Sequence, residues 1–171
     1  MPRNRLLGFA LAIAIFIVDQ LIKAWVTGPM DINQIGDVRE VVSFFDLRFV
    51  PNIGISLGLL PADGPFMRWA LVLLTAGIAT GVAVWMWRET VRGDVIALAL
   101  VLGGALGNIL DRMRFGYVVD FADLHFGDWR PFLVFNVADA AITIGVVILL
   151  VRSLFAKKPV RDGGSGEVRN A

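Results

Sequence analysis

Long apolar blocks alternate with short polar segments along most of the chain. Four blocks approach the ~20 residues that a helix needs to cross the hydrocarbon core of a membrane. They lie at about 6–26, 69–87, 95–112 and 132–151. Their apolar residues are contiguous, without the spacing of an amphipathic helix or a half-buried strand, which is typical of membrane spans. The pattern predicts a mainly α membrane protein, a bundle of four transmembrane helices.

The connection between the first two spans has a different pattern. Residues 45–49, Phe-Asp-Leu-Arg-Phe, alternate apolar and polar side chains as a half-buried strand does. Residues 51–54, Pro-Asn-Ile-Gly, are expected to form a turn. The apolar residues 55–60 that follow are expected to rest at the membrane interface. We therefore predict a small extracytoplasmic β platform and an interfacial segment.

Composition agrees with a single membrane domain. Of 171 residues, 57% are hydrophobic and only 18% are charged, and the mean hydropathy is +0.71. We assign residues 1–156 to one integral membrane domain and 157–171, with its Gly-Gly-Ser-Gly run, to a disordered cytoplasmic tail. A net charge of +1 argues against nucleic acid as a partner. The absence of cysteine excludes thiolate chemistry, and no metal or cofactor is expected.

Basic residues predict the orientation of the spans. Arg3 and Arg5 precede the first span, Arg88 and Arg92 link the second to the third, and further basic residues follow the fourth. With four spans these segments share one side, which the positive-inside rule makes cytoplasmic. Both termini are then cytoplasmic. The N-terminus imitates a cleaved leader, but no A-x-A-like site follows, so we favour an uncleaved anchor.

Polar residues within the spans gather at one level under this topology. Asp19 and Lys23 lie in the outer half of the first span. Asn108, Asp111 and Arg112 lie at the outer end of the third. Asp139 lies in the first two turns of the fourth span, where a carboxylate costs ~2.5–3.5 kcal/mol on insertion scales and marks a candidate functional site.

A second aspartate makes hydrolysis a plausible chemistry. Asp120 lies in the outer loop that precedes the fourth span. Two neighbouring aspartates share a proton, so one can activate water as a base while the other polarises a carbonyl group. This route needs no metal, thiol or histidine.

Other readings remain open on the residues alone. Asp139 can instead be neutralised by Arg112 or Lys23 as a structural ion pair, and Asp120 can be an ordinary turn aspartate. A transporter subunit or a structural scaffold would also contain intramembrane charges. The G-x-S-x-G match around Ser56 and a Ser56–Lys23 dyad are weak nucleophile candidates. Five glycines are expected to allow close helix packing, namely Gly77, Gly81, Gly103, Gly104 and Gly107.

Five segments together resemble those of the bacterial lipoprotein signal peptidase (signal peptidase II) family. They are Asp-Gln-Leu-Ile-Lys at 19–23, Asn-Ile-Gly-Ile-Ser at 52–56, Gly-Gly-Ala-Leu-Gly-Asn-Ile-Leu-Asp-Arg at 103–112, Gly-Tyr-Val-Val-Asp-Phe at 116–121 and Phe-Asn-Val-Ala-Asp at 135–139. They occur in the family's order across nearly the whole chain. One departure is Leu57, where the family usually has an aromatic residue.

The resemblance implies an aspartic endopeptidase of the bacterial inner membrane. Such enzymes remove the signal peptide of diacylglyceryl-modified prolipoproteins, cutting just before the lipidated cysteine, near the outer (periplasmic) surface. The implied partners are these precursors and membrane lipid, and we expect a monomer. By analogy Asp120 and Asp139 are the catalytic dyad. The implied supporting residues are Asp19, Lys23, Asn52, Gly54, Gly104, Asn108, Arg112, Asn136 and Ala138.

Overall fold

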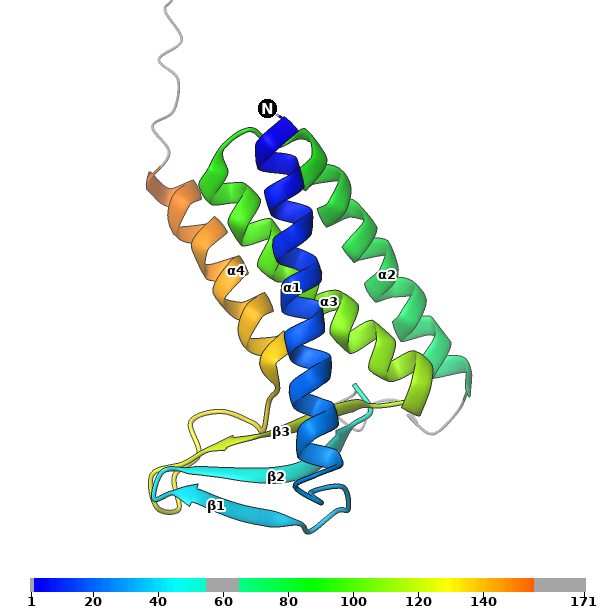
Figure 1. The fold of residues 1–171 in the computed structure, drawn as a ribbon, viewed down its shortest axis with the longest axis vertical. Coiled ribbons are helices and arrows are strands. Elements are labelled where there is room, and N and C mark those ends of the chain that lie inside the picture. Colours follow the sequence, from blue (N-terminus) through cyan, green and yellow to red (C-terminus); the bar gives the residue numbers. More distant parts are fainter. Residues whose placement is uncertain (1, 55–64, 156–171) are drawn as a thin grey trace, which may run out of the picture.

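A computed structural model describes residues 2–54 and 65–155. These residues form four long helices, α1 (Pro2–Thr27), α2 (Pro65–Arg88), α3 (Arg92–Phe115) and α4 (Val137–Phe155). All four are long and apolar enough to cross a membrane, which confirms the predicted four-helix bundle. A small sheet lies at the end of the bundle where α1 and α3 finish and α4 begins (Figure 1). The predicted interfacial segment at 55–60 and the predicted tail lie outside the described residues.

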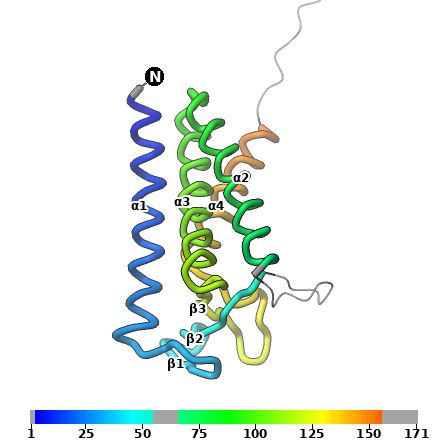
Figure 2. The backbone as a smooth tube through the Cα atoms, turned by 90° about the vertical axis from the view of Figure 1, so that its right-hand side faces the viewer, coloured from blue at the N-terminus to red at the C-terminus, as the bar shows by residue number. Residues whose placement is uncertain are grey.

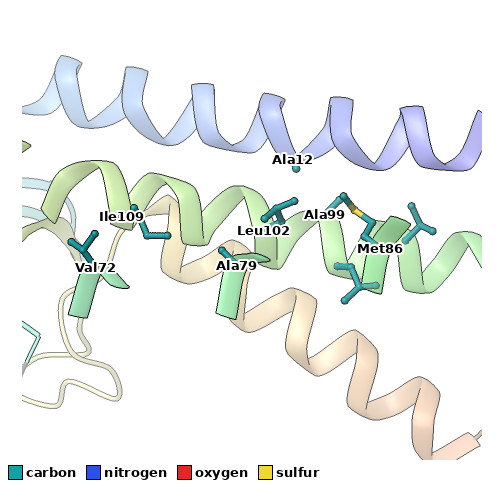
Figure 3. Close-up of a cluster of buried hydrophobic side chains, with 9 residues drawn as sticks. Ala12, Val72, Ala79, Met86, Ala99, Leu102 and Ile109 are labelled. Carbon is teal, nitrogen blue, oxygen red and sulfur yellow. The ribbon is translucent and has the colours of Figure 1, made fainter. Parts of the chain in front are cut away.

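Helix α3 is the centre of the bundle. In its most apolar window 56% of the residues are buried, against 17% to 22% in the other three helices. Helices α1, α2 and α4 all pack on it, and the tube in Figure 2 shows α3 between α1 and the other two. The apolar core lies along the contact of α2 with α3 and α1 (Figure 3) and includes Ala12, Val72, Ala79, Met86, Ala99, Leu102 and Ile109.

Close helix contacts depend on glycine in α3. A Cβ atom at Gly104 would collide with the carbonyl oxygen of Ala138 in α4, and one at Gly107 would collide with the carboxylate of Asp19 in α1. The predicted packing role is confirmed for these positions. It is wrong for Gly77 and Gly81, where a Cβ atom would meet nothing within 4 Å, because other residues of α2 face α3.

The sheet is a three-stranded antiparallel platform in the order β1-β2-β3. Its strands are β1 (Val38–Val42), β2 (Phe45–Asn52) and β3 (Val118–Leu124). Strand β2 confirms the predicted strand but continues through Asn52, so half of the predicted turn is strand. Strand β3 was expected to be loop. It is buried along nearly its whole length, so it lacks the alternation that reveals a half-exposed strand.

Helix α4 begins later than the apolar run predicted. The run starts at Phe132, but the helix starts at Val137. The preceding chain pairs with β3 instead: the Phe135 N–H donates to the Ala122 carbonyl at 3.0 Å, and the Ala122 N–H donates back at 2.8 Å. Asp139 therefore lies in the first turn of α4, nearer to the sheet than the prediction placed it.

Candidate active site

The first turn of α4 fixes Asp139 through a reciprocal cap. The side-chain oxygen of Asn136 accepts the Asp139 N–H at 2.9 Å, and the Asp139 carboxylate accepts the Asn136 N–H at 3.3 Å. This is the geometry of a capping box, with an aspartate where glutamate or glutamine is usual. Both groups would otherwise be unsatisfied at the helix start. Local helix chemistry therefore orients the Asp139 side chain.

Asp120 projects from β3 toward the same cap. Its two carboxylate oxygens accept hydrogen bonds from the side-chain amides of Asn136 at 2.6 Å and Asn52 at 2.9 Å. Asn52 ends β2, beside β3, and its own amide oxygen accepts the Gly54 N–H at 2.8 Å. The sheet thus positions both Asp120 and Asn52, which orients it, and Asn136 contacts both aspartates.

Asn108 of α3 completes this cluster. Its amide nitrogen donates to Asp139 at 2.8 Å. Its amide oxygen accepts hydrogen bonds from Asn136 and from Lys23, each at 3.3 Å. Three asparagines, from β2, α3 and the start of α4, therefore hold two carboxylates that lie 19 residues apart in sequence. We call Asp120, Asp139, Asn52, Asn108 and Asn136 the amide cluster.

No cation neutralises either aspartate of the amide cluster within 4.0 Å among residues 2–54 and 65–155. The alternative in which Asp139 forms an ion pair with Lys23 or Arg112 is therefore wrong. Burial raises the pKa of Asp120 to about 7, and the nearby charge of Asp139 raises it further against the opposing hydrogen bonds from Asn52 and Asn136. Asp120 thus retains a proton near neutral pH.

Asp19 and Lys23 belong to a second buried cluster, which we call the ion triad together with Asp111. Lys23 lies 2.8 Å from Asp19 and 2.7 Å from Asp111. Asp19 also accepts the Ala138 N–H at 2.9 Å, and Asp111 accepts the Val119 N–H at 3.1 Å. The triad therefore ties α1 and α3 to the starts of α4 and β3. The alternative Ser56–Lys23 dyad stays untested, because Ser56 lies outside the described residues.

Two residues of this network are absent from the predicted set. Asp111 bridges Lys23 to β3, and the side-chain amide of Gln20 donates to Asp111 at 2.8 Å. Both stand inside the recognised motifs, next to Arg112 and Asp19. Their position in those motifs could have identified them as site residues. Their residue types alone could not, because a polar helix end commonly contains the same residues.

Gly54 and Arg112 lie close together beside the amide cluster. Gly54 has a φ of +89°, and a Cβ atom there would approach Leu71 at 2.9 Å and the Arg112 guanidinium at 3.4 Å. Glycine is therefore required for conformation and for space. The buried Nε of Arg112 has no hydrogen-bond partner within the described part of the chain. Of the other predicted residues, Gly104 contacts α4 rather than the amide cluster.

Each aspartate lines a cavity of its own. Asp120 lines one of about 290 Å³ together with Asn52 and Gly54. Asp139 lines another of about 240 Å³ on the side of α4. Leu133 borders both. Within residues 2–54 and 65–155, no cluster of three or more His, Asp or Glu side chains could hold a metal ion.

The fold and this site define a class: a multi-pass membrane protein with one buried and one half-buried carboxylate, neither within 4.0 Å of a cation among the described residues, at one end of its helical bundle. The family model described as signal peptidase (SPase) II matches residues 11–155. The chain belongs to the signal peptidase II family, and is therefore a protease.

Individual relatives agree with this assignment. The chain is 54% identical to a lipoprotein signal peptidase of Rhizorhabdus wittichii, over 91% of this chain and 90% of that protein. It is 55% identical to one of Sphingopyxis alaskensis, over 86% and 84%. A solved structure described as a bacterial membrane enzyme superposes with a TM-score of 0.75 at 29% identity, over 88% of this chain and 94% of that chain.

Proposed function

We propose that this protein removes the signal peptide from diacylglyceryl-modified prolipoproteins, cutting before the lipidated cysteine with Asp120 and Asp139 as its catalytic dyad. The relatives named lipoprotein signal peptidases support the substrate class. The observation that carries the mechanism is the amide cluster. It holds two carboxylates on one asparagine, with no neutralising cation among the described residues.

The two aspartates have different roles in this proposal. Asp139, ionised, takes a proton from a water molecule, whose oxygen attacks the scissile carbonyl carbon. Asp120, protonated because burial raises its pKa to about 7, gives its proton to the carbonyl oxygen as the tetrahedral intermediate forms. When the C–N bond breaks, the proton held by Asp139 passes to the amine of the new N-terminal cysteine. The carbonyl re-forms and returns the other proton to Asp120.

The neighbouring residues orient the reactants. Asn52, Asn108 and Asn136 fix the carboxylates. The Nε of Arg112, which has no hydrogen-bond partner among the described residues, offers a donor to the substrate backbone where Gly54 leaves room. Asp19 and Lys23 hold the helices that carry these groups, and Ala138 contributes its N–H to that scaffold. We place this site near the periplasmic surface of the bacterial inner membrane, with both termini cytoplasmic. We expect the protein to act as a monomer that contacts membrane lipid directly.

The test is cleavage of a diacylglyceryl-modified precursor by purified protein. Asp120→Asn and Asp139→Asn are compared with wild type and with Asp128→Asn, an exposed aspartate between β3 and α4. Loss of either dyad carboxylate should reduce the cleavage rate by about 10²–10⁴-fold, the scale of general acid–base catalysis. The Asp128 variant should cleave as wild type does, and thermal unfolding checks that every variant is folded.

The outcomes separate the mechanism from the function. A folded dyad variant that cleaves at near wild-type rate would overturn the dyad. A wild-type protein that leaves the lipidated precursor intact would overturn the function itself. Inhibition by a chelator would contradict the metal-independent route.

A further inference from the structure

The cavity beside Asp139 is an apolar groove on the surface of α4. Among the residues that the structure describes, its apolar wall consists of Phe132, Leu133, Phe135, Ala140 and Ile144, and its polar side chains are Asp139 and Thr143. Phe132, Leu133 and Ile144 are more than half exposed. We call this cavity the α4 groove. It combines a hydrocarbon lining with one proposed catalytic carboxylate at its edge.

The α4 groove opens toward lipid rather than toward the bundle. The side of α4 that packs on α3 contains Ala138 and Gly145, which touch α3 directly. Ala140 and Thr143 follow Ala138 by two and five residues, and at 3.6 residues per turn they point to the opposite side of the helix. An apolar group can therefore enter this groove sideways from the bilayer and reach Asp139 without crossing water.

We propose that the α4 groove binds an acyl chain of the diacylglyceryl group on the substrate cysteine. This inference rests on the proposed function. The reacting bond adjoins the lipidated cysteine, so the lipid must lie within a few bonds of Asp139. Leu133 borders both cavities, so a peptide beside Asp120 and a chain in the α4 groove would be neighbours.

The α4 groove has a volume of about 240 Å³, and its wall is almost entirely hydrocarbon. A flexible hydrocarbon chain fits such a volume, and its burial there is favourable.

The experiment fills the α4 groove and varies the lipid. Thr143→Trp places a large side chain in the groove at an exposed position of α4, where folding should tolerate it. The matched control is Leu150→Trp, which lies two turns further along the same face and outside the groove. Both variants and wild type are given one precursor peptide carrying either two palmitoyl chains or two butanoyl chains.

Thr143→Trp should lower kcat/KM for the long-chain precursor by about tenfold, equivalent to ~1.4 kcal/mol, and leave the short-chain precursor nearly unchanged. Leu150→Trp should change neither. An equal loss on both precursors, or no loss on either, would overturn the acyl site while cleavage by the wild type upholds the proposed function. An equal loss on both precursors would assign the groove to the signal peptide, which the two precursors share. If wild type cleaves neither precursor, the proposed function fails, and the acyl site fails with it.

Discussion

The ion triad and the amide cluster contain buried carboxylates at the same end of the bundle, yet their surroundings differ. In the ion triad one lysine lies between two aspartates, at 2.8 Å and 2.7 Å. In the amide cluster the aspartates are held by neutral asparagines, at 2.6 Å to 3.3 Å. The two clusters touch only through the hydrogen bond from Lys23 to Asn108.

The difference separates groups that hold the fold from groups available for reaction. In the ion triad each carboxylate is balanced by a fixed counter-ion and accepts a backbone N–H. In the amide cluster Asp120 has no cation within 4.0 Å among the described residues, and burial raises its pKa to about 7, so it can exchange a proton near neutral pH. Under the proposed function, the same residue type therefore serves structure in one cluster and chemistry in the other.

The largest expected stability effect comes from breaking the ion triad. Lys23→Met leaves Asp19 and Asp111 buried without their cation, and removing one partner of a buried ion pair costs about 3–5 kcal/mol. Thermal unfolding in detergent, followed by circular dichroism, measures the change. The triple variant Asp19→Asn, Lys23→Met, Asp111→Asn should recover part of the loss. A single variant as stable as wild type would show that the triad does not hold the fold.

Much of the fold could be predicted from apolar runs, because a span needs only length and hydrophobicity. The start of α4 could not, since Phe132 to Phe135 are as apolar as the helix but pair with β3. Strand β3 was also missed, because its burial removes the period-2 pattern. Asp139 stood out as a costly charge within a span, whereas Asp120 was expected in a loop. Asn108 was placed at the same level by the topology, and the resemblance supplied the roles of the asparagines. The contact between Asp19 and Lys23 is a local i, i+4 pair, but the contact of Lys23 with Asp111 depends on how α1 and α3 approach each other, which no local pattern contains.

A second expected effect is a pH dependence specific to Asp120. Its pKa rises from 3.8 to about 7 on folding, so between these values the folded protein keeps a proton that the unfolded chain has lost. The contribution of protonated Asp120 to the free energy of unfolding is therefore complete below about pH 4 and decreases as the pH rises to 7. The total change is at most roughly 4 kcal/mol. Activity that needs the proton should fall about tenfold per pH unit above 7.

Asp120→Asn tests this sign directly. The variant should gain stability relative to wild type as pH rises from 4 to 7, while Asp128→Asn should follow wild type throughout. The free energy of unfolding, measured at each pH, provides the comparison. The cleavage rate of wild type, measured above pH 7, tests the expected loss of activity. A constant difference between Asp120→Asn and wild type across this range would place the pKa of Asp120 near its ordinary value. The proposed role of Asp120 as the acid would then be wrong.

The smallest expected effect divides a structural and a chemical role within one residue. Asn136 caps α4 by accepting the Asp139 N–H, and its amide also donates to Asp120 at 2.6 Å. Serine at this position keeps a capping oxygen but loses the amide donor, whereas alanine loses both. Asn136→Ala should therefore be less stable than Asn136→Ser by about 1 kcal/mol, with cleavage reduced to a similar extent in both. If Asn136→Ser retains wild-type cleavage, the cap alone positions the dyad and the amide bond to Asp120 is dispensable. If the two variants have the same unfolding temperature, the start of α4 is held mainly by the hydrogen bond from the Ala138 N–H to Asp19. The ion triad would then position the first turn of α4 as well as Asn108.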